Sequence, residues 1–153
     1  MWIGLFLFLT GTDLAVKQYV ETQMEETEEI PLSRRLFFRK VHNRGFLLGK
    51  LEEFPGLIKG VSMLTAGMAG LFALQGIRKE KSRKAKAGLV LTLAGAASNL
   101  YDRMVRGYVV DYIGIEEVKG LPKGFTANLA DLYLLAGAVL SAFGGKGGRK
   151  QRR

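Results

Sequence analysis

Four apolar runs, separated by short polar segments, constrain what this chain can fold into more than any other feature. The runs cover residues 1–20, 56–77, 87–105 and 128–144. The first two reach the ~20 mostly apolar residues that a helix needs to cross a ~30 Å hydrocarbon core, and the other two are slightly shorter. They mostly lack the polar face of a helix in a soluble bundle, which is the alternative fold. The pattern predicts a mainly α-helical integral membrane protein with four transmembrane helices.

The basic residues predict how these helices are oriented. Six basic residues in 78–86 and five in 146–153 account for the whole net charge of +9. Because cytoplasmic loops of membrane proteins carry an excess of Lys and Arg, we expect both stretches and both termini in the cytoplasm, with 21–55 and 106–127 outside. A nucleic-acid-binding protein would spread this charge over a folded face, so no nucleic-acid partner is expected. We expect one domain over 1–145 and a basic cytoplasmic tail over 146–153.

The two outer segments are rich in strand-forming residues. Residues 36–41 and 46–48 flank a predicted turn, and 108–113 contains several Val, Ile and Tyr residues. Such residues favour a pleated, half-buried surface. We therefore predict a small extracytoplasmic β-sheet formed by the 21–55 and 106–127 segments, with a short interfacial helix near 115–121.

Ionisable residues inside apolar helices need a physical reason, because each costs about 2.5–3.5 kcal/mol at the centre of a bilayer. Asp13 and Lys17 are four residues apart, so both lie on one helix face and can form a structural ion pair. Asn99 and Asp102 close the third run, and Asn128 and Asp131 open the fourth, each pair with a three-residue spacing. The predicted topology brings these polar residues to a similar depth near the outer face, with Asp111 on the segment between them.

Carboxylates at such a place have three interpretations. Two of them can share a proton, so that the ionised one activates water while the protonated one donates to a scissile carbonyl. Asp102, Asp111 and Asp131 can instead hold magnesium. The chain has one histidine, His42, and no cysteine, which argues against a zinc peptidase. In the third interpretation, these residues only cap helix ends.

Several sequence blocks in the same order resemble lipoprotein signal peptidase, also called signal peptidase II. They spread over nearly the whole chain, roughly residues 5–142. The blocks are Asn99-x-x-Asp102-Arg103, residues 107–113 around Asp111, Asn128-x-x-Asp131, Asn43-x-Gly45 and Asp13-x-x-x-Lys17.

This resemblance implies an aspartic endopeptidase of the bacterial cytoplasmic membrane that requires no metal or other cofactor. Its substrates would be prolipoproteins with a diacylglyceryl group on a cysteine, cut just before that cysteine, and globomycin would inhibit it. By motif position the catalytic pair is Asp111 and Asp131. The resemblance makes Asp102 a structural partner of Arg103 or of the helix end. The supporting and substrate-binding residues it implies are Asn43, Gly45, Asn99, Asp102, Arg103 and Asn128.

Two further functions stay open at this point. A non-catalytic relative would bind lipidated peptides without cutting them, and Ala127 and residues 46–48, which differ from the family pattern, motivate this alternative. A small membrane channel or scaffold is the other. Membrane lipids are expected partners in every case, and we expect a monomer.

Overall fold

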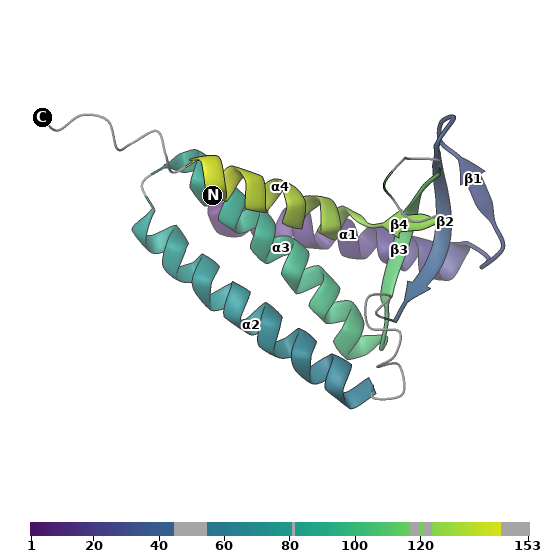
Figure 1. Cartoon of the computed structure of the whole chain (residues 1–153), viewed down its shortest axis with the longest axis horizontal. Coiled ribbons are helices and arrows are strands. Elements are labelled where there is room, and N and C mark those ends of the chain that lie inside the picture. The colour runs from purple at the N-terminus through teal and green to yellow at the C-terminus, as the bar shows by residue number, and fades with distance from the viewer. Residues whose placement is uncertain (45–54, 81, 117–119, 121–123, 145–153) are drawn as a thin grey trace, which may run out of the picture.

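The computed structural model describes residues 1–44, 55–80, 82–116, 120 and 124–144, with side chains given for only part of residues 55–66. Four helices and one small sheet make up this part of the chain (Figure 1). The third helix packs against each of the other three, and the sheet lies at one end of the bundle. The elements, in chain order, are α1 (Trp2–Gln23), β1 (Glu29–Pro31), β2 (Leu36–Asn43), α2 (Pro55–Lys79), α3 (Arg83–Val105), β3 (Val109–Ile115), β4 (Phe125–Ala127) and α4 (Leu129–Gly144).

All four apolar runs form helices, and Pro55 is the first residue of α2. Proline suits this position because its fixed backbone angle matches a helix and its missing N–H would have no partner there. The third helix starts four residues earlier than the apolar run suggests. Ser82 caps it by accepting a hydrogen bond from the Ala85 amide, so Arg83 and Lys84 form its first turn.

The predicted sheet exists and combines both outer segments. Its four strands are antiparallel in the order β1-β2-β3-β4, and the β2–β3 register shifts between Phe38 and Val41. Two of the strands, β1 and β4, have only three residues each and carried no separate sequence signal. The expected helix near 115–121 is wrong at its start, because Ile115 belongs to β3; residues 117–119 and 121 lie outside the described residues, as do 46–48.

Small residues bring α3 and α4 into close contact. A methyl group added at Gly137 would lie 2.7 Å from the Gly88 carbonyl oxygen, and one added at Gly88 would lie 2.7 Å from the Ser141 amide. Backbone approaches of this kind exclude any side chain larger than hydrogen. The two helices therefore have little freedom to slide, which matters because α4 begins at the candidate site.

Among the residues described here, none of the helices combines the length and the apolar content needed to cross a membrane.

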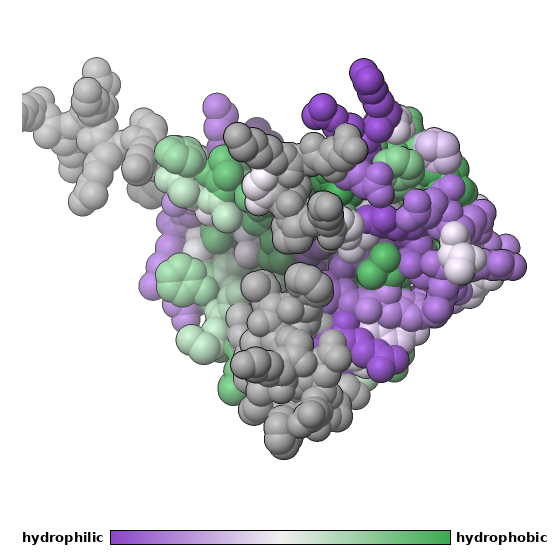
Figure 2. All heavy atoms as spheres, turned by 45° about the vertical axis from the view of Figure 1, so that its right-hand side comes forward, coloured by the Kyte–Doolittle hydropathy of each residue, from purple (hydrophilic) through white to green (hydrophobic). Residues whose placement is uncertain are grey.

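Large apolar side chains lie on the outside of the helices, while polar ones lie within. Figure 2 shows hydrophobic residues on the helical side and hydrophilic residues mainly toward the sheet. The buried set, in contrast, includes seven polar or charged residues. Exposed large apolar side chains on α1, α2 and α4 include Ile3, Leu7, Phe8, Leu64, Met68, Leu71, Phe72, Leu74, Leu135, Val139 and Phe143.

Candidate active site

Asp111 and Asp131 come together through a single residue, Asn128. The Asn128 side-chain amide donates to Asp111 Oδ1 at 2.7 Å, and the Asn128 backbone amide donates to Asp131 Oδ2 at 3.2 Å. The two remaining carboxylate oxygens also accept hydrogen bonds: Asn43 Nδ2 lies 2.9 Å from Asp111 Oδ2, and Asn99 Nδ2 lies 3.0 Å from Asp131 Oδ1. The structure thus brings together five of the residues singled out from the sequence, on β2, α3, β3 and the start of α4.

Local structure explains why Asn128 and Asp131 take these positions. Asn128 Oδ1 accepts from the Asp131 amide at 2.9 Å, while the Asp131 carboxylate accepts from the Asn128 amide. This is the reciprocal arrangement of a helix capping box. Helix capping is therefore part of what these two residues do. It does not account for the contacts of Asn128 with Asp111 and of Asp131 with Asn99.

The environments of the two carboxyl groups differ. Asp111 lies on β3 with 2% of its surface exposed, whereas Asp131 is half-buried in the first turn of α4. Burial and the neighbouring charge of Asp131 raise the pKa of Asp111 to about 6, although the amides of Asn43 and Asn128 and the charge of Lys17 act in the opposite direction. Asp131 instead lies in the first turn of α4, where its two oxygens accept from the Asn99 side chain and from the Asn128 amide.

A buried ionic network lies directly behind this pair. Lys17 is fully buried, and its ammonium lies 3.0 Å from Asp13 Oδ2 and 3.0 Å from Asp102 Oδ2. It also donates to Asn99 Oδ1 at 2.8 Å and to Ser98 Oγ at 3.3 Å. The Asp13–Lys17 pair is therefore part of a larger cluster that joins α1 to α3.

Asp102 belongs to this network and not to the catalytic pair. Its carboxylate accepts from Lys17, from the Val110 amide at 3.1 Å and from the Arg106 guanidinium. The expected pairing with Arg103 is wrong, because Arg106 lies one turn further along and faces the carboxylate. The Arg103 side chain makes no hydrogen bond or ion pair with any residue that the structure describes.

The same network holds the backbone on both sides of the site. Asp13 Oδ1 accepts from the Ala130 amide at 3.2 Å and from the Tyr112 hydroxyl at 2.9 Å. The Tyr112 oxygen in turn accepts from the Leu129 amide at 3.0 Å. Buried polar groups of this kind are stable only when each has a partner, and here the partners are amides at the start of α4. The first turn of α4 is thereby attached to α1.

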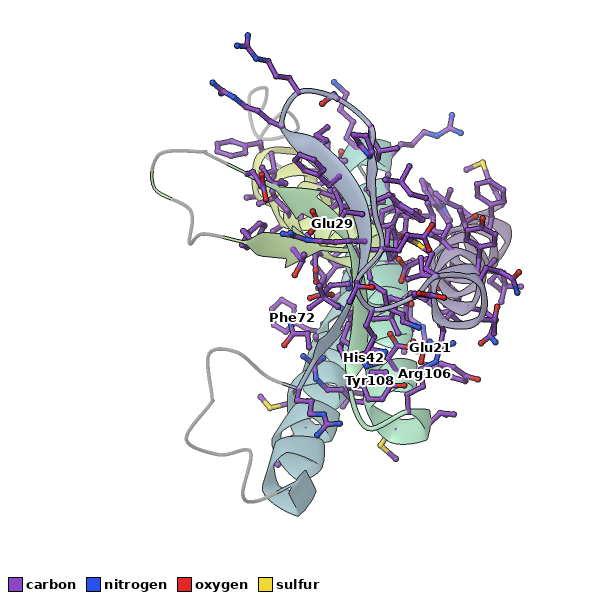
Figure 3. The ribbon with its side chains drawn as sticks, turned by 90° about the vertical axis from the view of Figure 1, so that its right-hand side faces the viewer. Glu21, Glu29, His42, Phe72, Arg106 and Tyr108 are labelled. Carbon is purple, nitrogen blue, oxygen red and sulfur yellow. The ribbon has the colours of Figure 1, made fainter. Side chains whose placement is uncertain are left out.

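A second group of polar side chains connects α1 to the sheet beside the site (Figure 3). His42 Nε2 lies 3.0 Å from Glu21 Oε2, and the Tyr108 hydroxyl donates to Glu21 Oε1 at 2.9 Å. The rings of His42 and Tyr108 are 4.1 Å apart. Since Asn43 directly follows His42 on β2, these contacts help to fix the strand that supplies an amide to Asp111.

Sequence reasoning missed several of these residues. Ser98 carries no sequence signal for a polar role in the site, and Tyr112 fits the strand pattern of 108–113 without indicating a hydrogen bond to α1. The four-residue spacing from Asp102 to Arg106 was the one available signal for that pair. Gly45, one of the predicted supporting residues, lies outside the described residues.

The same side-chain positions show whether the carboxylates form a metal site. Within the described part of the chain, no three His, Cys, Asp or Glu residues are grouped so as to hold a metal ion. The proposed magnesium ligand Asp102 is occupied by Lys17 and Arg106.

The chain is similar to one family of known proteins. The family model described as "Signal peptidase (SPase) II" matches residues 5–144. The chain is similar to the lipoprotein signal peptidase of Pseudoalteromonas translucida, with 32% identity over 94% of this chain and 86% of the relative. That of Teredinibacter turnerae is 32% identical over 95% of this chain and 89% of its own length. That of Clostridioides difficile is 28% identical over 91% and 90%.

The fold is also similar to solved structures. A bacterial membrane enzyme determined by the in meso method superimposes with a TM-score of 0.80 at 20% identity, covering 99% of this chain and 93% of that one. This likeness concerns the fold, while the sequence match concerns the family. Because the family model covers most of the chain and includes every residue of the site, the chain belongs to the signal peptidase II family of peptidases.

Proposed function

We propose that this chain is a membrane aspartic endopeptidase that removes the signal peptide from diacylglyceryl-modified prolipoproteins, cutting before the lipidated cysteine. Its family membership and the names of its relatives support the substrate class. One observation carries the mechanism: Asn128 donates to both Asp111 and Asp131, and the charge of Asp131 acts on Asp111, so the two carboxyl groups lie near each other.

The different surroundings of the two carboxyl groups support different roles. Asp111 is the general acid, because its pKa of about 6 lies near a neutral working pH and lets it hold a proton. Asp131 is the general base, because it is the more exposed of the two carboxyl groups and both of its oxygens accept N–H hydrogen bonds. Asp131 takes a proton from water, the resulting hydroxide attacks the scissile carbonyl carbon, and Asp111 protonates the carbonyl oxygen.

The side-chain amides of three asparagines, Asn43, Asn99 and Asn128, would hold Asp111 and Asp131 in the orientation that these roles need. Each amide donates to a carboxylate oxygen and none can accept a proton from it. They fix both carboxyl groups without competing for the shared proton. The resulting tetrahedral intermediate collapses when Asp131, which now carries the proton taken from water, donates it to the peptide nitrogen and the C–N bond breaks. Asp111 takes back a proton from the hydroxyl group as the new carboxyl group forms, so both aspartates return to their starting states.

We also propose that the helices lie in the bacterial cytoplasmic membrane, with both termini in the cytoplasm and the site near the outer face. The exposed apolar side chains of α1, α2 and α4 support this placement, since large apolar patches on a protein surface mark contact with another apolar phase. The buried charges of Asp13, Lys17 and Asp102 support it as well, because ionisable groups in membrane helices face the interior and pair with one another.

The direct test mixes the purified protein in detergent micelles with a diacylglyceryl prolipoprotein. Release of the signal peptide, with and without a chelator at equal rates, is the expected result. Binding of the substrate without any product would instead show a non-catalytic relative. A rate that falls with chelator and returns with Mg²⁺ would restore the magnesium alternative.

A further inference from the structure

The buried ammonium of Lys17 has contacts that an ion pair with Asp13 does not require. It lies at the centre of a cluster in which Asp13, Asp102 and Asn99 each make one contact with Lys17 and another with the candidate site. A lysine that only balanced the charge of Asp13 would need one of these contacts. The other two call for a different explanation.

The side chain of Asn99 forms the first connection between Lys17 and the pair of aspartates. An ammonium group can donate hydrogen bonds but not accept them, so the amide oxygen of Asn99 has to face Lys17. The NH₂ end of the same amide then faces the other way, where it donates to Asp131 Oδ1 at 3.0 Å. Lys17 therefore orients the Asn99 side chain so that its NH₂ group, and not its oxygen, faces Asp131.

Two further connections join Lys17 to the backbone amides of the residues that precede Asp111 and Asp131. Through Asp102, Lys17 is connected to the amide of Val110, the residue before Asp111. Through Asp13, it is connected to the amide of Ala130, the residue before Asp131. Every group in both connections is buried, so water cannot take the place of a lost partner without rearrangement.

We infer that Lys17 is a positioning residue for both members of the Asp111–Asp131 pair, which it orients through Asn99, Asp102 and Asp13 without touching the substrate. This inference rests on the proposed function for its kinetic consequence, but the orientation itself is a property of the unliganded protein. Lys17 is fully buried behind the pair, so its removal acts on the reaction rate and not on substrate affinity.

The charge of Lys17 gives an independent measure of the connection. Among the charged groups around Asp111, Asp131 raises its pKa and Lys17 lowers it. Loss of the ammonium must therefore raise the pKa of Asp111. A lysine whose charge lay too far from the pair to act on it would leave this titration unchanged, whereas the positioning role itself is tested by the separate effects on kcat and KM.

The variants have to keep the protein folded. Lys17→Met alone leaves two buried carboxylates, so the test uses Lys17→Met combined with Asp13→Asn, in which Asp102 still pairs with Arg106. The reference is Asp13→Asn alone, which keeps the ammonium and its contact with Asn99. Lys40→Met, on β2, controls for loss of a lysine elsewhere.

The first measurement gives kcat and KM on a diacylglyceryl prolipoprotein. The second follows the titration of the Asp111 carboxyl group by infrared spectroscopy with ¹³C-labelled aspartate. The Asp111 band is assigned as the one that disappears in Asp111→Asn. Relative to Asp13→Asn, the double variant should lose about 100-fold in kcat, the effect of a ~1 Å misplacement, with KM within about threefold. Its Asp111 midpoint should move to higher pH, and Lys40→Met should match the wild type in both measurements.

A double variant with the kcat of Asp13→Asn, or with an unshifted Asp111 midpoint, overturns the inference. If the wild-type protein cleaves no prolipoprotein, the proposed function fails separately, and the infrared midpoint still tests whether Lys17 acts on Asp111 in the unliganded protein: a shift supports that connection, and no shift refutes the inference.

Discussion

Gly95 on α3 offers a direct way to move the start of α4. A methyl group added at this glycine would lie 2.4 Å from the Ala130 carbonyl oxygen and 2.9 Å from Leu134 Cγ. A normal contact is about 3.4 Å or longer, so Gly95→Ala requires Ala130 to move by roughly 1 Å. The obstacle is backbone and cannot turn aside as a flexible side chain would. Because Asp131 is the next residue, the displacement passes straight to the proposed general base.

The size of the effect follows from this geometry. Overpacking of a close contact costs about 1–3 kcal/mol of stability. A ~1 Å misplacement of a catalytic group costs about 100-fold in rate. We therefore expect Gly95→Ala to fold and accumulate, but to process prolipoprotein about 100-fold more slowly than the wild type.

The assay follows signal-peptide release by the purified protein in micelles, alongside thermal unfolding. Gly11→Ala on α1 is the matched control, because nothing lies within 4 Å of a methyl group added there. It should process at the wild-type rate. If Gly95→Ala retained both the wild-type rate and the wild-type melting temperature, the close α3–α4 contact would not position Asp131, and the reasoning would be refuted.

Two further predictions concern groups around the pair. Lys17→Met leaves the buried carboxylates of Asp13 and Asp102 without the cation between them, which should destabilise the protein by about 3–5 kcal/mol; an unchanged melting temperature in detergent would contradict this. Asn43→Ala removes a hydrogen bond that lowers the pKa of Asp111. The pKa of Asp111 should then rise above about 6, so Asp111 should stay protonated to higher pH. The alkaline limb of the pH–rate profile should therefore move up by about one pH unit. A limb that stays in place or moves down would show that Asp111 is not the general acid.

Much of the fold followed from the sequence because its signals are local. The apolar runs predicted all four helices, and the second run lies directly after Pro55, the first residue of α2. The strand-forming residues predicted β2 and β3, whose pairing then drew the outer segments into one sheet. The short strands β1 and β4 have no comparable signal, since three residues show no periodicity and form only because a neighbouring strand is present.

The site was predictable to a smaller extent. Spacing alone placed Asp102, Asp111 and Asp131 at one depth, and only the resemblance distinguished Asp102 from the other two. The structure gives the physical reason for that distinction: Asp102 faces Lys17 and Arg106 inside the bundle. Contacts between distant segments, such as that of Lys17 with Asn99, depend on how α1 packs against α3. No local pattern in the sequence encodes that packing.

The central claim is that Asp111 and Asp131 are the catalytic pair, and one measurement tests it most directly. Asp111→Asn and Asp131→Asn keep the size of each side chain but remove its proton chemistry, and Glu25→Gln is the control at an exposed acid. Cleavage of a diacylglyceryl prolipoprotein by the purified variants should fall by about 100- to 10,000-fold for each aspartate and stay at the wild-type rate for the control. Wild-type cleavage by either aspartate variant would contradict the account.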